Sequence, residues 1–137
     1  GFPGEAEADF EETCARLLDS PLAFAHVFTY SERKGTPAKR SEEHVEMAER
    51  QRRSLHLRRL SEKKRYDYYR SHVGREMNVL FEDPKPGAWT GLTDNYVRVC
   101  MPRAGSDGRD LTNRLARVSL KSIEADFVEG TLVDILD

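Results

Sequence analysis

The sequence predicts an α+β protein in which a helical first half precedes a small, five-stranded, antiparallel β-barrel. Apolar residues recur at helical spacing over 5–19 and again within 42–72, whereas after Gly74 they alternate with polar residues at every second position. Five short strand candidates then follow between 77 and 135. Closing such short strands into a barrel removes the exposed sheet edges.

Only the middle of the chain has the excess of basic residues that would favour a negatively charged partner. The 137 residues fit one ordinary domain or two small ones, with 34% charged residues and a net charge of −2. Acidic residues dominate 5–19 and the last stretch of the chain, whereas basic residues dominate 50–65. The near-neutral total therefore hides a basic middle.

The sequence predicts a cytoplasmic protein in a reducing environment. No apolar run approaches the ~20 residues of a membrane span, and the first residues lack the features of a signal peptide. Cys14 and Cys100 are too few for a disulfide framework or a four-ligand metal site, and the four histidines lack metal-ligand spacing. The first residue is not Met, which favours a piece of a longer protein.

The first half is expected to hold two helices and one strand. The acids early in 5–19 complement the dipole of a helix over those residues. Residues 22–30 are aromatic and β-branched and predict a buried strand. After a loop over 31–40, a long helix is expected from Glu42 to His72, with Ser41 as its N-cap and room for a break near Ser61.

The second half is expected to hold only strands, loops and turns. The strand candidates cover 77–81, 89–92, 96–101, 115–120 and 130–135. The chain thus divides into an α/β segment (1–40), a helical linker (41–73) and a barrel (74–137). One helix and one strand cannot satisfy the strand's backbone groups, so the α/β segment is expected to be the remnant of a larger domain.

Three motifs resemble those of one enzyme family and occur in the same order. They are GFPGEAEADFEET at the start, HVFTYSERKGTPAKR in the middle and TGLTDNYVRV at 90–99. This order resembles the radical SAM methylthiotransferases, which add a methylthio group to tRNA or to a ribosomal protein. The resemblance implies that 1–40 ends a radical SAM barrel and that 74–137 is a TRAM domain, an OB-like RNA-binding β-barrel. TGLTDNYVRV resembles the branch that acts on threonylcarbamoyladenosine beside the anticodon.

The same resemblance implies cofactors that this chain is not expected to hold. A full-length parent uses S-adenosylmethionine and two 4Fe-4S clusters, one of them held by a C-x3-C-x2-C motif. Neither cysteine set occurs here. Because the cluster supplies the electron that cleaves S-adenosylmethionine, we expect a catalytically inactive fragment without catalytic or metal-binding residues. The fragment is also expected to be a monomer. Its expected partners are the anticodon stem-loop of a tRNA and the missing domains of the same protein, with no membrane.

Two candidate sites lie in the α/β segment. The resemblance places Gly1, Phe2 and Gly4 at the edge of the S-adenosylmethionine pocket; the alternative is a turn that needs glycine for its backbone angles. Tyr30 with the cations Arg33 and Lys34 could stack on a base and hold phosphates. The alternative for this second group is a solvated loop.

The basic helix and the barrel offer two further candidates. The helix is either a phosphate track or a solvated surface with i,i+4 pairs such as Glu49 with Arg53; its bases are Arg50, Arg52, Arg53, Arg58, Arg59, Lys63, Lys64 and Arg65. In the barrel the candidate RNA contacts are Trp89, Thr93, Asn95, Tyr96 and Arg98.

The alternative for the barrel makes Trp89 and Tyr96 core residues beside a plain hairpin turn. The alternation of Tyr96 and Arg98 with Val97 and Val99 places the valines inside, which favours RNA binding. Two alternative functions remain open. The chain could be a stand-alone RNA-binding module, or the helix over 41–73 could serve oligomerisation. The unpartnered α/β segment favours the enzyme fragment over a free module.

Overall fold

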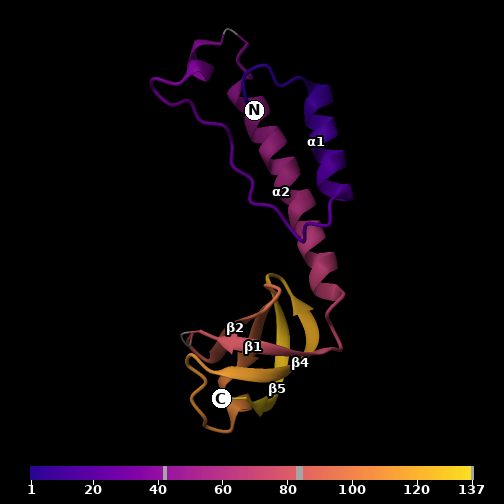
Figure 1. Ribbon diagram of the computed structural model, residues 1–137, viewed down its shortest axis with the longest axis vertical. Helices are drawn as coiled ribbons and strands as arrows, with labels where there is room; N and C mark the ends of the chain where they lie inside the picture. The colour runs from indigo at the N-terminus through magenta and orange to yellow at the C-terminus, as the bar shows by residue number, and fades with distance from the viewer. Residues whose placement is uncertain (42, 83–84, 137) are drawn as a thin grey trace. The chain divides into compact units, whose positions relative to one another are not determined.

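The computed structural model describes residues 1–41, 43–82 and 85–136, and it divides into two compact units (Figure 1). Unit 1 comprises Gly1–Arg65 and unit 2 comprises Tyr66–Asp137. The boundary falls inside the long helix α2 (Met47–Arg70), so the expected helical linker is shared between the two units. No helix within the described ranges is long and apolar enough to cross a membrane.

Unit 1 begins with helix α1 (Glu7–Asp19), close to the predicted bounds. The carboxylate of Asp9 accepts a hydrogen bond of 2.8 Å from the Ala6 N–H, which satisfies one free donor at the helix start. At the other end, the Lys64 ammonium of α2 donates to the carbonyl oxygens of Leu18 and Ser20, at 3.1 and 2.8 Å. A cation bonded to the last carbonyls complements the helix dipole.

The predicted strand over 22–30 is wrong, because this segment is irregular and runs beside α2 (Figure 1). A strand needs the backbone of a neighbouring strand, and the described part of unit 1 contains none. A side chain of α2 instead binds backbone groups of this segment. The Ser61 hydroxyl accepts from the Ala25 N–H at 2.8 Å and donates to the Ala25 carbonyl at 2.7 Å.

Helix α2 also differs from its prediction at its start and middle. It begins at Met47, so Ser41 does not cap it, and Glu42 lies outside the described residues. It continues through Ser61 without a break. The polar Ser61 side chain is buried within this helix and faces the irregular segment. A short 3-10 helix, η1 (Pro37–Arg40), precedes it.

Unit 2 is a closed barrel with strand order β1-β2-β3-β5-β4. Its strands are β1 (Glu76–Phe81), β2 (Ala88–Thr93), β3 (Arg98–Pro102), β4 (Leu115–Glu124) and β5 (Phe127–Ile135). The barrel prediction is confirmed, but the all-antiparallel pairing is wrong because β3 and β5 run parallel. Strand directions cannot alternate all the way around a closed ring of five, so one parallel pair is required.

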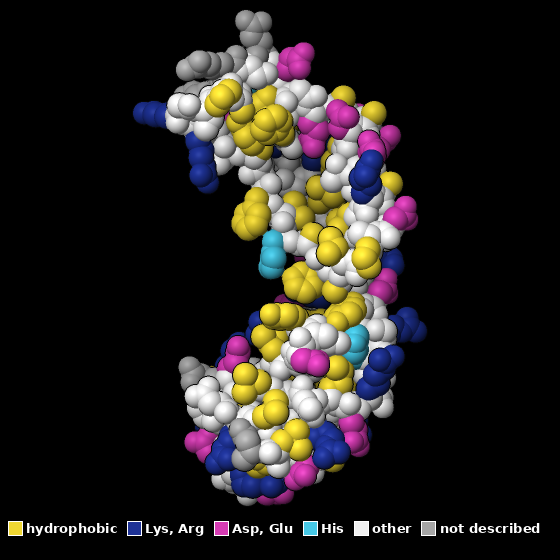
Figure 2. Space-filling view, in the orientation of Figure 1, with side chains coloured by type: hydrophobic (Ala, Val, Ile, Leu, Met, Phe, Trp, Pro, Cys, Tyr) yellow, Lys and Arg dark blue, Asp and Glu magenta, His cyan; other side chains and the backbone are white. Residues whose placement is uncertain are grey.

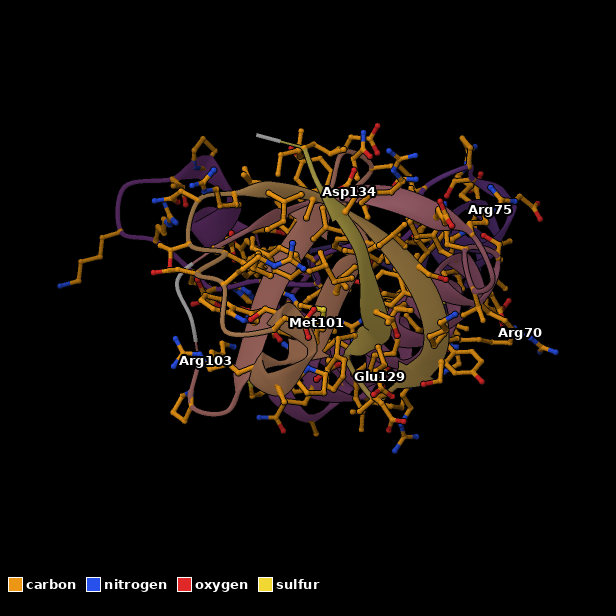
Figure 3. All side chains as sticks on the ribbon, turned by 90° about the horizontal axis from the view of Figure 1, so that it is seen from below. Arg70, Arg75, Met101, Arg103, Glu129 and Asp134 are labelled. Atoms are coloured by element: carbon orange, nitrogen blue, oxygen red, sulfur yellow. The ribbon has the colours of Figure 1, made fainter. Side chains whose placement is uncertain are left out.

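The barrel encloses the main apolar core. Val79, Phe81, Val99, Val118 and other inward residues are fully buried. Met101 is also fully buried, whereas Arg103 lies at the margin of the molecule in Figure 3. Gly91 is required by close packing, since a Cβ there would collide with the Leu80 carbonyl oxygen.

Candidate nucleic-acid interface

The turn between β2 and β3 holds the most exposed aromatic side chain of unit 2 in the described ranges. Tyr96 is 68% exposed and has a left-handed backbone with φ of 66°. The predicted strand over 96–101 starts too early, because β3 begins at Arg98. The predicted pattern of burial is nevertheless confirmed: Val97 and Val99 are fully buried, while Tyr96 and Arg98 are exposed.

The polar side chains of this turn point inward. The Thr93 hydroxyl accepts from the Val97 N–H at 2.8 Å and donates to the Asn95 amide oxygen at 2.6 Å. The Asn95 amide nitrogen lies 2.9 Å from His72 Nε2. Thr93, which is 4% exposed, and the half-buried Asn95 were expected to contact RNA, but here their polar groups bind the protein.

The last turn of α2 braces the same segment through two tyrosines. The Tyr68 hydroxyl donates to the Asn95 carbonyl at 2.9 Å, and the Arg98 N–H donates to the Tyr69 hydroxyl at 3.3 Å. Burial raises the pKa of Tyr68, with a smaller contribution from the charge of Asp94. The neutral hydroxyl therefore remains a hydrogen-bond donor across the physiological pH range.

Trp89 does not offer a stacking surface, since it is only 3% exposed. Its indole N–H donates to the hydroxyl of the buried Ser106 at 3.2 Å, and the Arg103 guanidinium lies 4.7 Å from the ring centroid. Trp89 is therefore a core residue, as the alternative interpretation predicted. Ser106 also bonds the Arg109 carbonyl at 2.8 Å and so anchors the loop that includes the short helix η2 (Arg103–Ser106).

A groove of about 470 Å³ lies beside Tyr96, and its lining combines three leucines with polar or acidic side chains that include Asn78, Glu82 and Asp94. Leu80 is paired across the sheet with Leu92 on one side and Leu115 on the other, and all three line the groove with Tyr96. Hydrophobic side chains lie exposed among charged ones on the visible face of unit 2 (Figure 2). The sequence contained a signal for this groove, because Leu80 stands between the inward Val79 and Phe81 and must point outward.

A second pocket, in unit 1, brings together residues from two predicted sites. Phe2, Tyr30 and Arg33 line a pocket of about 480 Å³. The Phe2 and Tyr30 rings pack edge to face at 5.3 Å, and the Arg50 guanidinium lies 5.4 Å from the Tyr30 centroid. Lys34 is exposed but does not line this pocket.

The start of the chain forms a glycine turn. Gly4 has φ of 84°, and its N–H donates to the Glu43 carbonyl at 2.8 Å. The Gly1 amine lies 2.7 Å from a Glu5 carboxylate oxygen. The backbone donor of Gly4 is therefore engaged within the protein, as the glycine-turn alternative requires.

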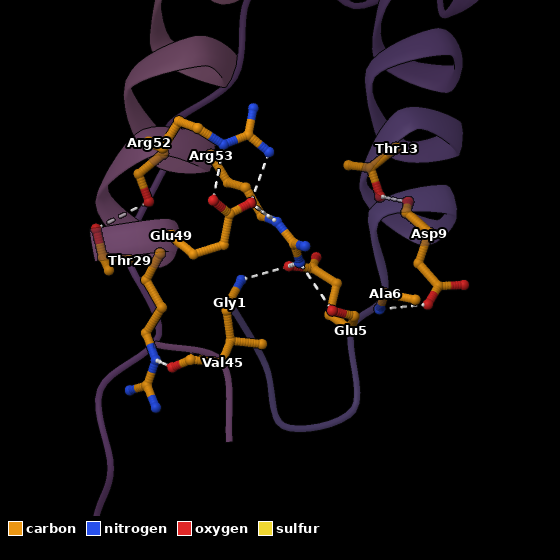
Figure 4. Close-up of polar contacts among 12 residues, drawn as sticks. Gly1, Glu5, Ala6, Asp9, Thr13, Thr29, Val45, Glu49, Arg52 and Arg53 are labelled. Atoms are coloured by element: carbon orange, nitrogen blue, oxygen red, sulfur yellow. Dashed lines mark hydrogen bonds and ion pairs between the residues drawn. The ribbon is translucent and has the colours of Figure 1, made fainter. Parts of the chain in front are cut away.

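The first basic residues of α2 are neutralised within unit 1 (Figure 4). Arg53 is buried and contacts Glu5, Glu7 and Glu49 at 2.8, 3.1 and 2.8 Å. Arg52 contacts Glu7 and Glu49 at 2.7 and 2.6 Å. Hydrogen bonds from Arg52 and Arg53 lower the pKa of Glu49 to about 2.

The rest of the basic stretch is divided between internal contacts and the surface. Arg50 is buried and donates to the Val45 carbonyl at 2.6 Å, and Lys64 bonds the end of α1. Arg58 and Arg59 are exposed. A continuous phosphate track along α2 is therefore not formed, because its first cations already have carboxylate partners.

The residues present do not fit an iron–sulfur cluster. Cys14 and Cys100 lie in different units, and burial raises the pKa of both thiols. Such clusters need several thiolates around one site. The part of the chain that the structure describes contains no group of three His, Cys, Asp or Glu residues placed to hold a metal ion.

Comparison with known proteins decides the family. No family model matches the chain. It is 33% identical over 135 residues to the tRNA-2-methylthio-N(6)-dimethylallyladenosine synthase of Anaplasma phagocytophilum (strain HZ), a match that covers 97% of this chain. This chain belongs to the tRNA methylthiotransferase family. It is also 28% identical over 142 residues to the threonylcarbamoyladenosine tRNA methylthiotransferase MtaB of Bacillus subtilis (strain 168), with 100% of the chain covered.

This chain spans only part of each relative. It covers 30% of the first relative and 31% of the second. The predicted resemblance is confirmed at the level of the family, and the partial coverage agrees with the predicted C-terminal part of such a protein. The two relatives carry the names of different modified adenosines, so the family match leaves the nucleoside open.

Proposed function

We propose that this chain is the tRNA-recognising C-terminal part of a methylthiotransferase, and that its barrel is a TRAM domain that contacts the anticodon stem-loop. The observation that best supports this proposal is the exposed pair of Tyr96 and Arg98. Tyr96 lines the groove formed with Leu80, Leu92 and Leu115. Small β-barrels bind single-stranded nucleic acid with aromatic rings that stack on bases and with cations that follow the backbone. Tyr96 and Arg98 supply one of each.

The groove extends the surface that Tyr96 offers to a nucleotide. Leu80, Leu92 and Leu115 provide an apolar floor against which an unstacked base could lie. Stacking on an aromatic ring contributes about 1–3 kcal/mol per base. One ring and one groove are therefore enough for weak binding of a loop with splayed bases, which is how single-stranded RNA is usually recognised.

Unit 1 by itself offers a separate candidate contact for RNA. Tyr30 and Arg33 share a pocket with Phe2, so an aromatic ring and a cation again meet at one opening. We assign Tyr30, Arg33 and the exposed Lys34 to RNA. Phe2, with Gly1 and Gly4 in the same turn, would border the S-adenosylmethionine pocket of the full-length enzyme.

The chemistry itself is assigned to parts of the enzyme outside these 137 residues. A 4Fe-4S cluster would supply the electron that cleaves S-adenosylmethionine, and the two cysteines here cannot hold one. We therefore expect the chain by itself to bind tRNA in the cytoplasm without modifying it. The segment TGLTDNYVRV supports threonylcarbamoyladenosine as the nucleoside.

Binding of synthetic anticodon stem-loops tests the proposal. Fluorescence anisotropy would compare a stem-loop carrying threonylcarbamoyladenosine with the same stem-loop carrying dimethylallyladenosine, and with a fully paired hairpin of equal length. The expected order of affinity is threonylcarbamoyladenosine first and the paired hairpin last. Equal affinity for all three would contradict recognition of the loop. A preference for dimethylallyladenosine would keep tRNA recognition and overturn the assigned nucleoside.

A further inference from the structure

We propose that His72, Asn95 and Thr93 are positioning residues that hold Tyr96 in its left-handed conformation and so aim its ring at RNA. The proposal rests on the proposed function of the barrel. It assigns His72, in the turn just after α2, a part in RNA recognition. It also changes the expected role of Thr93 and Asn95 from contact to support. A chain of hydrogen bonds between buried and half-buried groups carries the argument.

The Thr93 hydroxyl fixes the orientation of the Asn95 amide. Its oxygen lies 2.6 Å from Asn95 Oδ1 but 3.5 Å from the Val97 carbonyl oxygen. A hydroxyl has one hydrogen to donate, and the shorter distance assigns it to Asn95. The amide oxygen of Asn95 therefore faces Thr93, and its NH₂ group faces His72.

This orientation indicates which ring nitrogen of His72 carries the hydrogen. Asn95 Nδ2 donates to His72 Nε2 at 2.9 Å, so Nε2 carries no hydrogen. The remaining hydrogen sits on Nδ1, which lies 2.8 Å from the Tyr68 carbonyl oxygen and donates to it. The imidazole is 6% exposed and packs edge to face on the Tyr68 ring at 4.6 Å. These contacts thus place the ring hydrogen of His72 on Nδ1.

The network surrounds the strained residue on both sides in sequence. A left-handed backbone is costly for a residue with a Cβ and persists only where its surroundings hold it. The Asn95 side chain anchors the turn before Tyr96, and the Tyr96 N–H donates to the Thr93 carbonyl at 3.0 Å. The Val97 N–H bonds the Thr93 hydroxyl directly after it. Removing Asn95 would let the turn relax and withdraw the ring from the groove.

A double-mutant cycle on RNA affinity tests this coupling. Tyr96→Ala is expected to weaken binding of the anticodon stem-loop at least tenfold, and Asn95→Ala at least fivefold. The double variant is expected to bind no worse than Tyr96→Ala alone, because both changes remove the same contact. Gln51→Ala, which removes an exposed amide from α2, is the control and should leave affinity unchanged.

Two outcomes would overturn the positioning role and leave the proposed function intact. Fully additive losses would make Asn95 an independent RNA contact. Unchanged affinity in Asn95→Ala, with weakened binding in Tyr96→Ala, would show that the network does not act through the ring. If Tyr96→Ala has no effect either, the proposed RNA surface fails instead.

A second measurement needs no RNA. In long-range ¹H–¹⁵N NMR spectra, His72 is expected to show the Nδ1–H tautomer at neutral pH. Backbone couplings that report the sign of φ are expected to change at residue 96 in Asn95→Ala. Should Asn95→Ala not fold, Asn95→Asp replaces it: its carboxylate accepts from Thr93 and His72, so His72 should become doubly protonated. A singly protonated His72 in Asn95→Asp, or a left-handed residue 96 in Asn95→Ala, would overturn the network.

Discussion

At the scale of single residues, Tyr96 is exposed and its neighbour Val97 is buried, so substitutions of the two are expected to have opposite effects. Tyr96→Gly should weaken RNA binding by about 1–3 kcal/mol, because it removes a stacking ring. Its free energy of unfolding should stay within about 1 kcal/mol, since glycine adopts the left-handed conformation freely. Affinity measurements and urea unfolding would check both values.

Val97→Ala is the matched variant with the reverse expectation. Its side chain is fully buried, so truncation should lower the free energy of unfolding by about 2 kcal/mol and leave the affinity of the folded protein unchanged. If Tyr96→Gly unfolds the barrel while RNA affinity persists, the ring is structural, and the RNA site must lie elsewhere, such as the Arg33–Lys34 loop.

At the scale of elements, the contact of α1 with α2 depends on the Arg53 guanidinium. Arg53→Ala should lower the free energy of unfolding of unit 1 by about 2 kcal/mol, less than a fully buried pair because Glu7 and Glu49 are partly exposed. RNA affinity should not change, since this cation is already paired.

The control for Arg53 is an exposed ion pair within α1. Arg16 and Glu12 form an i,i+4 pair on the surface of α1, with side chains 78% and 60% exposed. Arg16→Ala should therefore cost less than about 0.5 kcal/mol. Urea unfolding followed by helical circular dichroism measures both variants, and equal costs would contradict the role assigned to Arg53.

The same arginines predict how unit 1 responds to acid. Arg52 and Arg53 lower the pKa of Glu49 to about 2, whereas the pKa of Glu5 is lowered, against the effect of burial, first by the Gly1 amine and then by Arg53. A carboxylate with a lowered pKa stabilises the fold above its unfolded pKa and loses that contribution as the pH falls through the folded value. The melting temperature of the helices should fall between about pH 4.5 and pH 2, and Glu49→Gln should reduce the slope. A melting temperature independent of pH in this range would contradict the network.

Several elements were predictable from local pattern, whereas others depended on distant partners. The five strand candidates each overlap one of the five strands, and the alternation around Val97 predicted which side chains are buried. The strand over 22–30 failed because strand formation depends on a neighbour that local sequence does not reveal. The internal hydrogen bonds of Thr93 and Asn95 were missed for a related reason: polar residues in a turn look exposed until the His72 side chain, distant in sequence, is placed beside them.

At the scale of the whole molecule, internal pairing limits the number of cations that can reach phosphates. If about four to six cations contact the backbone, affinity should fall tenfold or more between about 50 and 200 mM salt. Arg98→Ala should reduce the slope of log affinity against log salt by about one, whereas Arg53→Ala should not change it. Anisotropy titrations over this range measure the slope, and a flat response would contradict phosphate contacts.

The most direct test of RNA recognition by the barrel is an NMR titration of the ¹⁵N-labelled chain with the threonylcarbamoyladenosine stem-loop. Stacking on Tyr96 should shift the amide signals of 94–98 and of the strands that carry Leu80, Leu92 and Leu115. Signals from α1 should stay in place. Shifts confined to residues 1–65, or no shifts at all, would contradict the assignment of RNA recognition to the barrel.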